Sequence, residues 1–420
     1  MRLLTIIAVA ASAAQQGRGP TGPNRQGPDF SWIEHCKRLD SSEFRKRYRL
    51  SAEAFYVLLN KLWPWLVRSS TSKTGKKLGG KARTLPHVML AVTLRYFAGG
   101  DVLDLKLIYH LWSRRTVYAC IWRTVDAINK VFKASFPIDD MDFLKKKEAE
   151  FAAASSAPGA WRGQVGAVDG VHFQCLSPGK KVANPLRHHV ERKDKYAILA
   201  IAVADAHRRL PYFDMSQVPT THDALAWHAS SLGAKERAGE LPYPFFFNGD
   251  AAFAGGPSMI VPSGGLDDDF DFYQSSNRMC VECAFGVCIR RFPLLWRPIQ
   301  ARLDRRAPLI GAIFHIHNFC IDQRLEEESV ASDSLVEIQP CRYRMSPHFD
   351  KEGRPVKYLT APGDCDDATR CHRRAQDTQV STSRRDELRA ALSEAGLIRP
   401  QAALLGLPRK QKKGRKRKPK

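Results

Sequence analysis

Two apolar stretches decide the fold class: VGAVDGVHFQCL (residues 165–176) and YAILAIAVADAHRRLPYFD (residues 196–214). The first is a short apolar run that predicts a buried strand. The second predicts two strands joined by a turn at residues 205–209. Working outward, the periodicity is helical before residue 150 and strand-like from residue 160 onward. We therefore expect an α/β layered domain in the second part of the chain.

Toward the C-terminus, helices and a further strand follow these two stretches. YPFFFNGDAAF (243–253) predicts a buried strand that ends in a loop. Helices are expected at ALAWHASSLGAKERAG (224–239), RMCVECAFGVCIRRFPLL (278–295) and APLIGAIFHIHNFCIDQRL (307–325). Residues 326–408 are polar and poorly defined, with one predicted helix at 384–397.

Toward the N-terminus, residues 30–150 predict a helical region. Ser51 is placed to cap AEAFYVLLNKLWPWL (52–66), and a second helix reads LPHVMLAVTLRYFAGG (85–100). The short helix DLKLIYHLW (104–112) precedes RRTVYACIWRTVDAINKVF (114–132), which Ser113 is placed to cap. This pair is similar to a helix-turn-helix, in which Arg114 and Arg115 would meet DNA. An ordinary helical bundle with a basic rim is the alternative, and residues 152–160 predict a linker.

The charge balance indicates a polyanionic partner. The chain of 420 residues has a formal net charge of +23, and Lys or Arg occupies nine of the twelve positions from Arg409 to Lys420. Basic residues near phosphates release condensed counterions, so nucleic acid is the expected partner. The tail 409–420 predicts a nuclear-localisation or DNA-binding segment, and a merely solvated tail is the alternative.

The first 29 residues give a conflicting signal. MRLLTIIAVAASAA (1–14) resembles a signal peptide, and residues 15–29 predict a disordered lead. The ten cysteines form no regular disulfide framework and lie mostly in apolar stretches, which indicates free thiols in a reducing compartment. A spurious or alternative start is therefore the competing explanation. No other segment reaches 18 uninterrupted apolar residues, so no membrane span is expected.

Four acidic residues are candidates for chemistry. Asp169 and Asp250 each follow an apolar strand segment, and adjacent central strands would bring them together. Close carboxylates repel unless a cation lies between them, and Mg²⁺ or Mn²⁺ prefers such oxygen ligands. Glu282 lies on an apolar helix, where pairing with Arg278 four residues earlier is the alternative. Asp223 directly precedes a helix, where N-capping is the alternative.

Other groups of possible metal ligands are predicted to be structural. The acidic run at residues 267–271 is expected to be solvated surface. Cys280, Cys283 and Cys288 are expected to lie on a helix and to pack against other residues rather than bind a metal. His315 and His317 alternate within an apolar helix and are expected in the core or at its end.

Five motifs in order carry a family resemblance. AVDGVH (167–172), PTTHDALAWHASS (219–231), NGDAAF (248–253), NRMCVECAFGVCIRRFPLL (277–295) and HIHNFC (315–320) follow one another, with the four acids 54, 27 and 32 positions apart. Over residues 160–325 this order resembles the DDE endonuclease domain of PIF/Harbinger transposases. The region before it also resembles the helical part of that family.

The resemblance implies an RNase H-like fold and a metal-dependent DNA endonuclease. Asp169, Asp250 and Glu282 would be the catalytic acids, Asp223 would join them as a ligand of Mg²⁺ or Mn²⁺, and His222 would support the ligands or contact a phosphate. Two ions would activate water for attack on a phosphodiester at transposon ends, and the freed 3′-OH would attack target DNA. The residues expected to hold the DNA backbone are Lys193, Lys195, Arg290 and Arg291.

The resemblance also implies a nuclear protein with macromolecular partners. The family often works with a Myb-like DNA-binding protein, and cutting two transposon ends implies at least a homodimer. The chain departs from the family at Ile198 and Ala200, and its basic residue after Phe-Gly is delayed to Arg290. A second class therefore stays open: a domesticated, catalytically silent DNA-binding protein.

Overall fold

The computed structural model describes residues 30–67, 84–157, 159–179, 184–191, 194–332 and 379–399. The chain divides into two compact units, Met1–Val131 and Phe132–Lys420. The predicted lead 1–29 and the predicted basic tail 409–420 lie outside the described residues.

The first unit is helical in its described part. Its helices are α2 (Trp32–Lys37), α3 (Ser41–Tyr48), α4 (Ala52–Leu66), α5 (Pro86–Phe97), α6 (Val102–Ile108) and α7 (Arg114–Val131). The two predicted caps are present, since Ser51 Oγ accepts a hydrogen bond from Ala54 N at 3.2 Å and Ser113 Oγ accepts one from Thr116 N at 3.2 Å. Apolar residues at helical spacing in α4 are buried: Phe55, Leu58, Leu59 and Leu62.

The second unit is built on a mixed sheet. Its strands are β1 (Gln164–Gln174), β2 (His189–Val190), β3 (Lys195–Ala204), β4 (Tyr212–Asp214), β5 (Phe246–Asn248) and β6 (Met259–Ile260). Strands β2, β3, β1, β5 and β6 are neighbours in that order, and β4 pairs with β3. The pairs β1–β3 and β3–β4 are antiparallel, whereas β1–β5 and β5–β6 are parallel. The predicted two strands with a turn at residues 205–209 are therefore confirmed.

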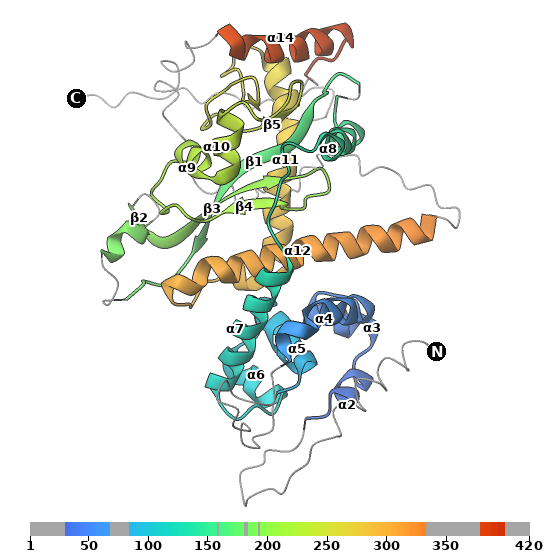
Figure 1. Ribbon diagram of the computed structural model, residues 1–420, viewed down its shortest axis with the longest axis vertical. Helices are drawn as coiled ribbons and strands as arrows, with labels where there is room; N and C mark the ends of the chain where they lie inside the picture. The colour runs from blue at the N-terminus through green and yellow to red at the C-terminus, as the bar shows by residue number, and fades with distance from the viewer. Residues whose placement is uncertain are drawn as a thin grey trace, which may run out of the picture. The chain divides into compact units, whose positions relative to one another are not determined.

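Helices cover both faces of this sheet (Figure 1). Adjacent residues of a strand point to opposite faces. Phe247 belongs to a core cluster with Leu144, Trp227 and Leu232, whereas Phe246 belongs to a second cluster with Phe270. The helices concerned are α8 (Met141–Ala154), α9 (Asp223–Ala229) and α10 (Ser231–Arg237) on one side, and α11 (Asp268–Arg291) and α14 (Gln379–Glu394) on the other.

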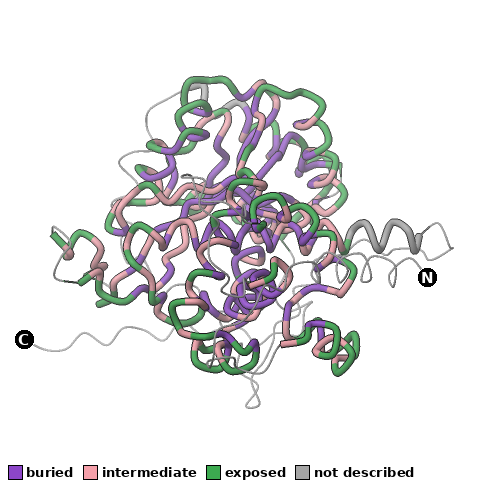
Figure 2. Tube along the Cα trace, turned by 60° about the horizontal axis from the view of Figure 1, so that its bottom comes forward, coloured by how far each residue is buried: buried purple, intermediate pink, exposed green. Residues whose placement is uncertain are grey.

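Further helical segments described in this unit are the helix α12 (Leu303–Ser332) and the short helices η1 (Pro185–His188) and η3 (Pro293–Trp296). Buried residues gather on the sheet and on the inner sides of the helices, and exposed residues lie on the outer turns (Figure 2). The fold class is thus α/β, with a mixed sheet flanked by helices. Among the described residues, no helix is long and apolar enough to span a membrane.

Two sequence predictions are wrong in this unit. The single helix predicted over 224–239 is broken at Ser230, whose backbone is extended. The break brings Gly233 so close to Trp227 that an added Cβ would lie 2.0 Å from the Trp227 carbonyl oxygen. The predicted linker 152–160 is not one, because α8 runs to Ala154 and both Ala157 and Ala160 are buried. The division between the units falls at Val131 instead, so α8 belongs to the second unit.

Candidate functional site

Asp169 and Asp250 are brought together by neighbouring parallel strands. Ala167 of β1 is paired with Asn248 of β5, and each aspartate follows its paired residue by two positions. The negative charge of Asp250 raises the pKa of Asp169, which shows that the two carboxylates lie within electrostatic reach. The strand pairing expected from the sequence therefore places these two acids as predicted.

Asp223 of α9 packs against β1, on the face of the strand opposite to the side chain of Asp169. A Cβ on Gly170, the residue after Asp169, would lie 2.7 Å from both Cγ and Oδ1 of Asp223. A larger residue at position 170 would displace this carboxylate from its place against the strand. The N-cap of α9 is His222, without a side-chain cap bond, and Asp223 is the first helical residue. The alternative that Asp223 serves as the N-cap is therefore wrong.

Glu282 reaches the site from α11, together with an arginine. Arg278 lies one turn before it, and its Nη2 is 2.7 Å from Oε1 of Glu282. Nη1 of the same guanidinium is 4.0 Å from Oδ2 of Asp169. The alternative of an Arg278–Glu282 pair is thus realised, and the guanidinium also faces the aspartate. We call Asp169, Asp250 and Glu282 the acid cluster; Asp223 lies against the opposite face of β1.

The pKa values in this cluster reflect burial together with the charges of neighbouring residues. Burial raises the pKa of Asp169 to about 7, opposed by Arg278 and reinforced by the charges of Asp250 and Glu282. Burial alone would lower the pKa of Arg278, but the attraction of Glu282, Asp169 and Asp250 raises it above its usual value. One guanidinium therefore compensates several carboxylates, and Asp169 is poorly compensated.

A buried amide network holds the three supporting elements together. The side chains of Gln164 in β1, Asn248 in β5 and Gln274 in α11 are buried. Gln274 Nε2 donates to Asn248 Oδ1 at 2.6 Å, and Asn248 Nδ2 donates to Gln164 Oε1 at 3.3 Å. Sequence reasoning missed this network, although an Asn inside the apolar FFFNGD segment was a signal for it. The network fixes the positions from which Asp169, Asp250 and Glu282 project.

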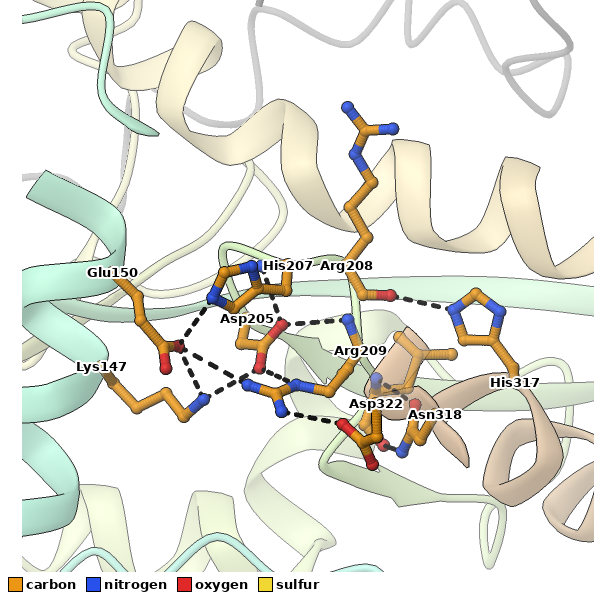
Figure 3. A network of polar contacts seen from close by, with 10 residues as sticks. Lys147, Glu150, Asp205, His207, Arg208, Arg209, His317, Asn318 and Asp322 are labelled. Atoms are coloured by element: carbon orange, nitrogen blue, oxygen red, sulfur yellow. Dashed lines mark hydrogen bonds and ion pairs between the residues drawn. The ribbon is translucent and has the colours of Figure 1, made fainter. Parts of the chain in front are cut away.

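A second group of charges lies between α8, the β3–β4 turn and α12 (Figure 3). Lys147 Nζ lies 2.9 Å from Oδ2 of Asp205, which also accepts a hydrogen bond from Nε of Arg209 at 2.7 Å. We call it the charged network; its members are Lys147, Glu150, Asp205, Arg209 and Asp322. Lys147 and Arg209 lower the pKa of Asp205 despite its burial. This group was not predicted from the sequence, because its members are far apart along the chain.

The predicted DNA-contacting residues belong to both units of the chain. Arg114 and Arg115 are exposed at the start of α7 in the first unit. In the second unit, Lys195 is exposed at the start of β3 and Arg290 is exposed in the last turn of α11. Arg291 instead donates a hydrogen bond from Nη1 to the His317 carbonyl at 3.2 Å. His222, predicted to support the ligands or contact a phosphate, is exposed. Lys193 is not among the described residues.

The other candidate ligands have structural roles. Asp267 caps α11 through its Oδ1, which accepts a hydrogen bond from Phe270 N at 2.9 Å. Cys280 and Cys288 are buried free thiols, and His317 is buried and bonded to the Arg208 carbonyl. In the part of the chain that the structure describes, no three His, Cys, Asp or Glu side chains are arranged to hold a metal ion.

Comparison of the chain with models of protein families, with curated proteins and with solved structures finds no match. The chain is thus placed in a class by its fold and its residues alone: an α/β protein whose mixed sheet carries an acid cluster where β1 and β5 lie side by side.

Proposed function

We propose that this chain is a divalent-metal-dependent DNA endonuclease of the transposase type, similar to PIF/Harbinger transposases. One observation carries the proposal: acids from β1, the loop after β5 and α11 lie within electrostatic reach of one another in the acid cluster. Together with Asp223 of α9 they are the four acids of the family motifs, and they occur in the same order along the chain. Convergence of acids separated by up to 113 positions is costly unless a cation is used there.

The donor set fits a divalent metal ion. Asp169, Asp223, Asp250 and Glu282 offer only carboxylate oxygens, which are the ligands that Mg²⁺ and Mn²⁺ prefer. The pKa of Asp169 is raised mainly by burial and further by the charges of Asp250 and Glu282, and Arg278 does not offset these effects. A bound ion would supply positive charge, lower the pKa of water and stabilise a leaving oxyanion. The chain's own contribution is the amide network, which fixes the acids' backbones before any ligand binds.

The strand arrangement supports an RNase H-like fold. Such a fold has three antiparallel strands beside two strands that run parallel to the first. Here β4, β3 and β1 are antiparallel neighbours, and β5 and β6 continue the sheet in parallel with β1.

DNA is the proposed substrate because of the charge. The net charge of +23 favours a polyanion, and the short helix α6 followed by the longer α7 is the pair that resembles a helix-turn-helix. Exposed Arg114 and Arg115 would then contact phosphates or base edges. A nuclear location, strand transfer at the same acids, action as a homo-oligomer and a Myb-like partner are parts of the same proposal.

The test is a nicking assay with the purified full chain. Supercoiled plasmid and a duplex are incubated with Mg²⁺, Mn²⁺ or Ca²⁺, and nicking is expected with the first two only. Asp169→Asn, Asp250→Asn and Glu282→Gln should each abolish it. Asp268→Asn, which removes an exposed carboxylate from the start of α11, is the matched control and should retain nicking. If Asp169→Asn and Asp250→Asn leave nicking unchanged, the proposal is wrong.

A second candidate is a catalytically silent DNA-binding protein. The ion pair of Arg278 with Glu282 at 2.7 Å favours it, because this acid already has a cationic partner. Such a protein would bind duplex DNA equally well in EDTA and in Mg²⁺, and would nick it in neither. DNA binding by mobility shift, measured beside the nicking assay, separates the two functions.

A further inference from the structure

Arg278 occupies the position of a cation in the acid cluster. Its guanidinium is 2.7 Å from an oxygen of Glu282 and 4.0 Å from an oxygen of Asp169, and it interacts electrostatically with Asp250. Its side chain is 15% exposed, so water does little to screen these interactions. The arginine therefore interacts with three of the four acids that are proposed to hold metal.

A guanidinium and a divalent ion compete for the same oxygens. An oxygen of Glu282 that accepts a hydrogen bond from Arg278 has fewer lone pairs to offer a metal, and two positive charges within a few ångströms repel. Arginine does not lose its proton in proteins, so its charge leaves the cluster only when the side chain moves. Arg278 and Glu282 lie one helical turn apart, so the arginine can leave by rotation of its own side chain, without any change in α11.

We propose that Arg278 is a displaceable internal cation that competes with a divalent metal ion for Asp169 and Glu282 and thereby sets the metal affinity of the acid cluster. This inference rests on the proposed function, since it assumes that the acids bind metal. It assigns Arg278 a positioning role: the residue stabilises the acids in the metal-free protein and gives way when the ion binds.

The test measures Mn²⁺ binding to the full chain by calorimetry, without DNA. Arg278→Gln should bind Mn²⁺ about tenfold more tightly than the wild type, which is within the usual range of coupling between two ligands. Arg278→Met, which keeps much of the side-chain volume without the charge, should give the same gain and serves if the glutamine variant does not fold. Arg389→Gln is the matched control, because Arg389 pairs with Asp267 at the start of the same helix, at 3.1 Å. It should bind Mn²⁺ as the wild type does.

The double variant Arg278→Gln, Asp169→Asn tests whether the tighter Mn²⁺ binding occurs at the acid cluster. It should not bind Mn²⁺ more tightly than the wild type. The midpoint of thermal unfolding gives a second readout: Mn²⁺ should raise it more in Arg278→Gln than in the wild type. A folded Arg278→Gln or Arg278→Met that binds Mn²⁺ no more tightly than the wild type overturns the inference. If nicking by the wild type still depends on Asp169 and Asp250, the proposed function survives that result. Loss of that dependence defeats the proposed function itself.

Discussion

The acid cluster and the charged network lie in the same unit and contain similar residues, yet their charge balance differs. In the charged network, Lys147 and Arg209 face three carboxylates, and the pKa of Asp205 is lowered. In the acid cluster, Arg278 faces Asp169 and Glu282, and the pKa of Asp169 is raised to about 7. Both aspartates are largely withdrawn from water. The difference shows that compensation by cations, rather than burial, separates a structural carboxylate from a candidate functional one.

The largest expected effect on stability comes from the charged network. Asp205→Asn should lower the free energy of unfolding by about 3–5 kcal/mol, because Lys147 and Arg209 lose their buried counter-ion. Urea denaturation at neutral pH measures it. Asp322→Asn is the control, since that carboxylate pairs with the same Arg209 but is 45% exposed, and it should cost no more than about 1 kcal/mol. Equal, small effects of both variants would remove the contrast between the two groups.

Substitution of Asp169 is expected to raise the free energy of unfolding, whereas substitution of Asp205 lowers it. In EDTA at about pH 8, Asp169→Asn should raise the free energy of unfolding by on the order of 1 kcal/mol, because it removes a poorly compensated charge. The measurement is the same urea denaturation. A loss of stability comparable to that of Asp205→Asn would mean that Asp169 is a structural carboxylate as well.

The two aspartates should also respond to pH in opposite directions. The pKa of Asp169 rises from 3.8 in a model compound to about 7 in the folded chain. Between these values the folded chain holds a proton that the unfolded chain has lost, so stability falls as the pH rises through this window. The stability contributed by Asp205, whose pKa is lowered, is present above its unfolded pKa and is lost as the pH falls through its folded pKa.

Urea midpoints at about pH 5 and about pH 8, in EDTA, test the Asp169 window. The decrease between them should be smaller in Asp169→Asn than in the wild type. The same decrease in both proteins would show that other groups account for it.

The smallest effect on stability is expected at Gly170. Gly170→Ala should change the free energy of unfolding by less than about 1 kcal/mol, because the new methyl group meets a carboxylate that can turn away. Nicking should nevertheless fall by about ten- to a hundredfold, because Asp223 is displaced. Gly286→Ala, where an added Cβ has nothing within 4 Å, is the control and should leave nicking unchanged.

Features set by neighbouring residues were predictable from the sequence. The caps at Ser51 and Ser113, the two strands around residues 205–209 and the Arg278–Glu282 pair all depend on residues close along the chain. The meeting of Asp169 and Asp250 was predictable for a different reason. The carboxyl ends of neighbouring parallel strands lie side by side, so one assumption about pairing placed both residues.

What the sequence did not predict depends on distant contacts. The break at Ser230 follows from the close approach of Gly233 to the Trp227 carbonyl, which no local preference signals. The bond from Lys147 to Asp205 joins residues 58 positions apart. The second contact of Arg278, with Asp169, required the packing of α11 against β1. The hydrophobic periodicity of the sequence predicts each helix or strand, but not which other element it packs against.

The amide network has a consequence for how this chain can evolve. Gln274 Nε2 donates hydrogen bonds to Asn248 Oδ1 and to the Gly249 carbonyl, and Asn248 Nδ2 donates one to Gln164 Oε1. An apolar replacement of any one would leave a buried polar partner unsatisfied. Joint replacement would still remove the acceptor of Trp161 Nε1, which donates to Gln164 Oε1 at 2.7 Å. Positions 164, 248 and 274 should therefore all stay polar among descendants of this sequence.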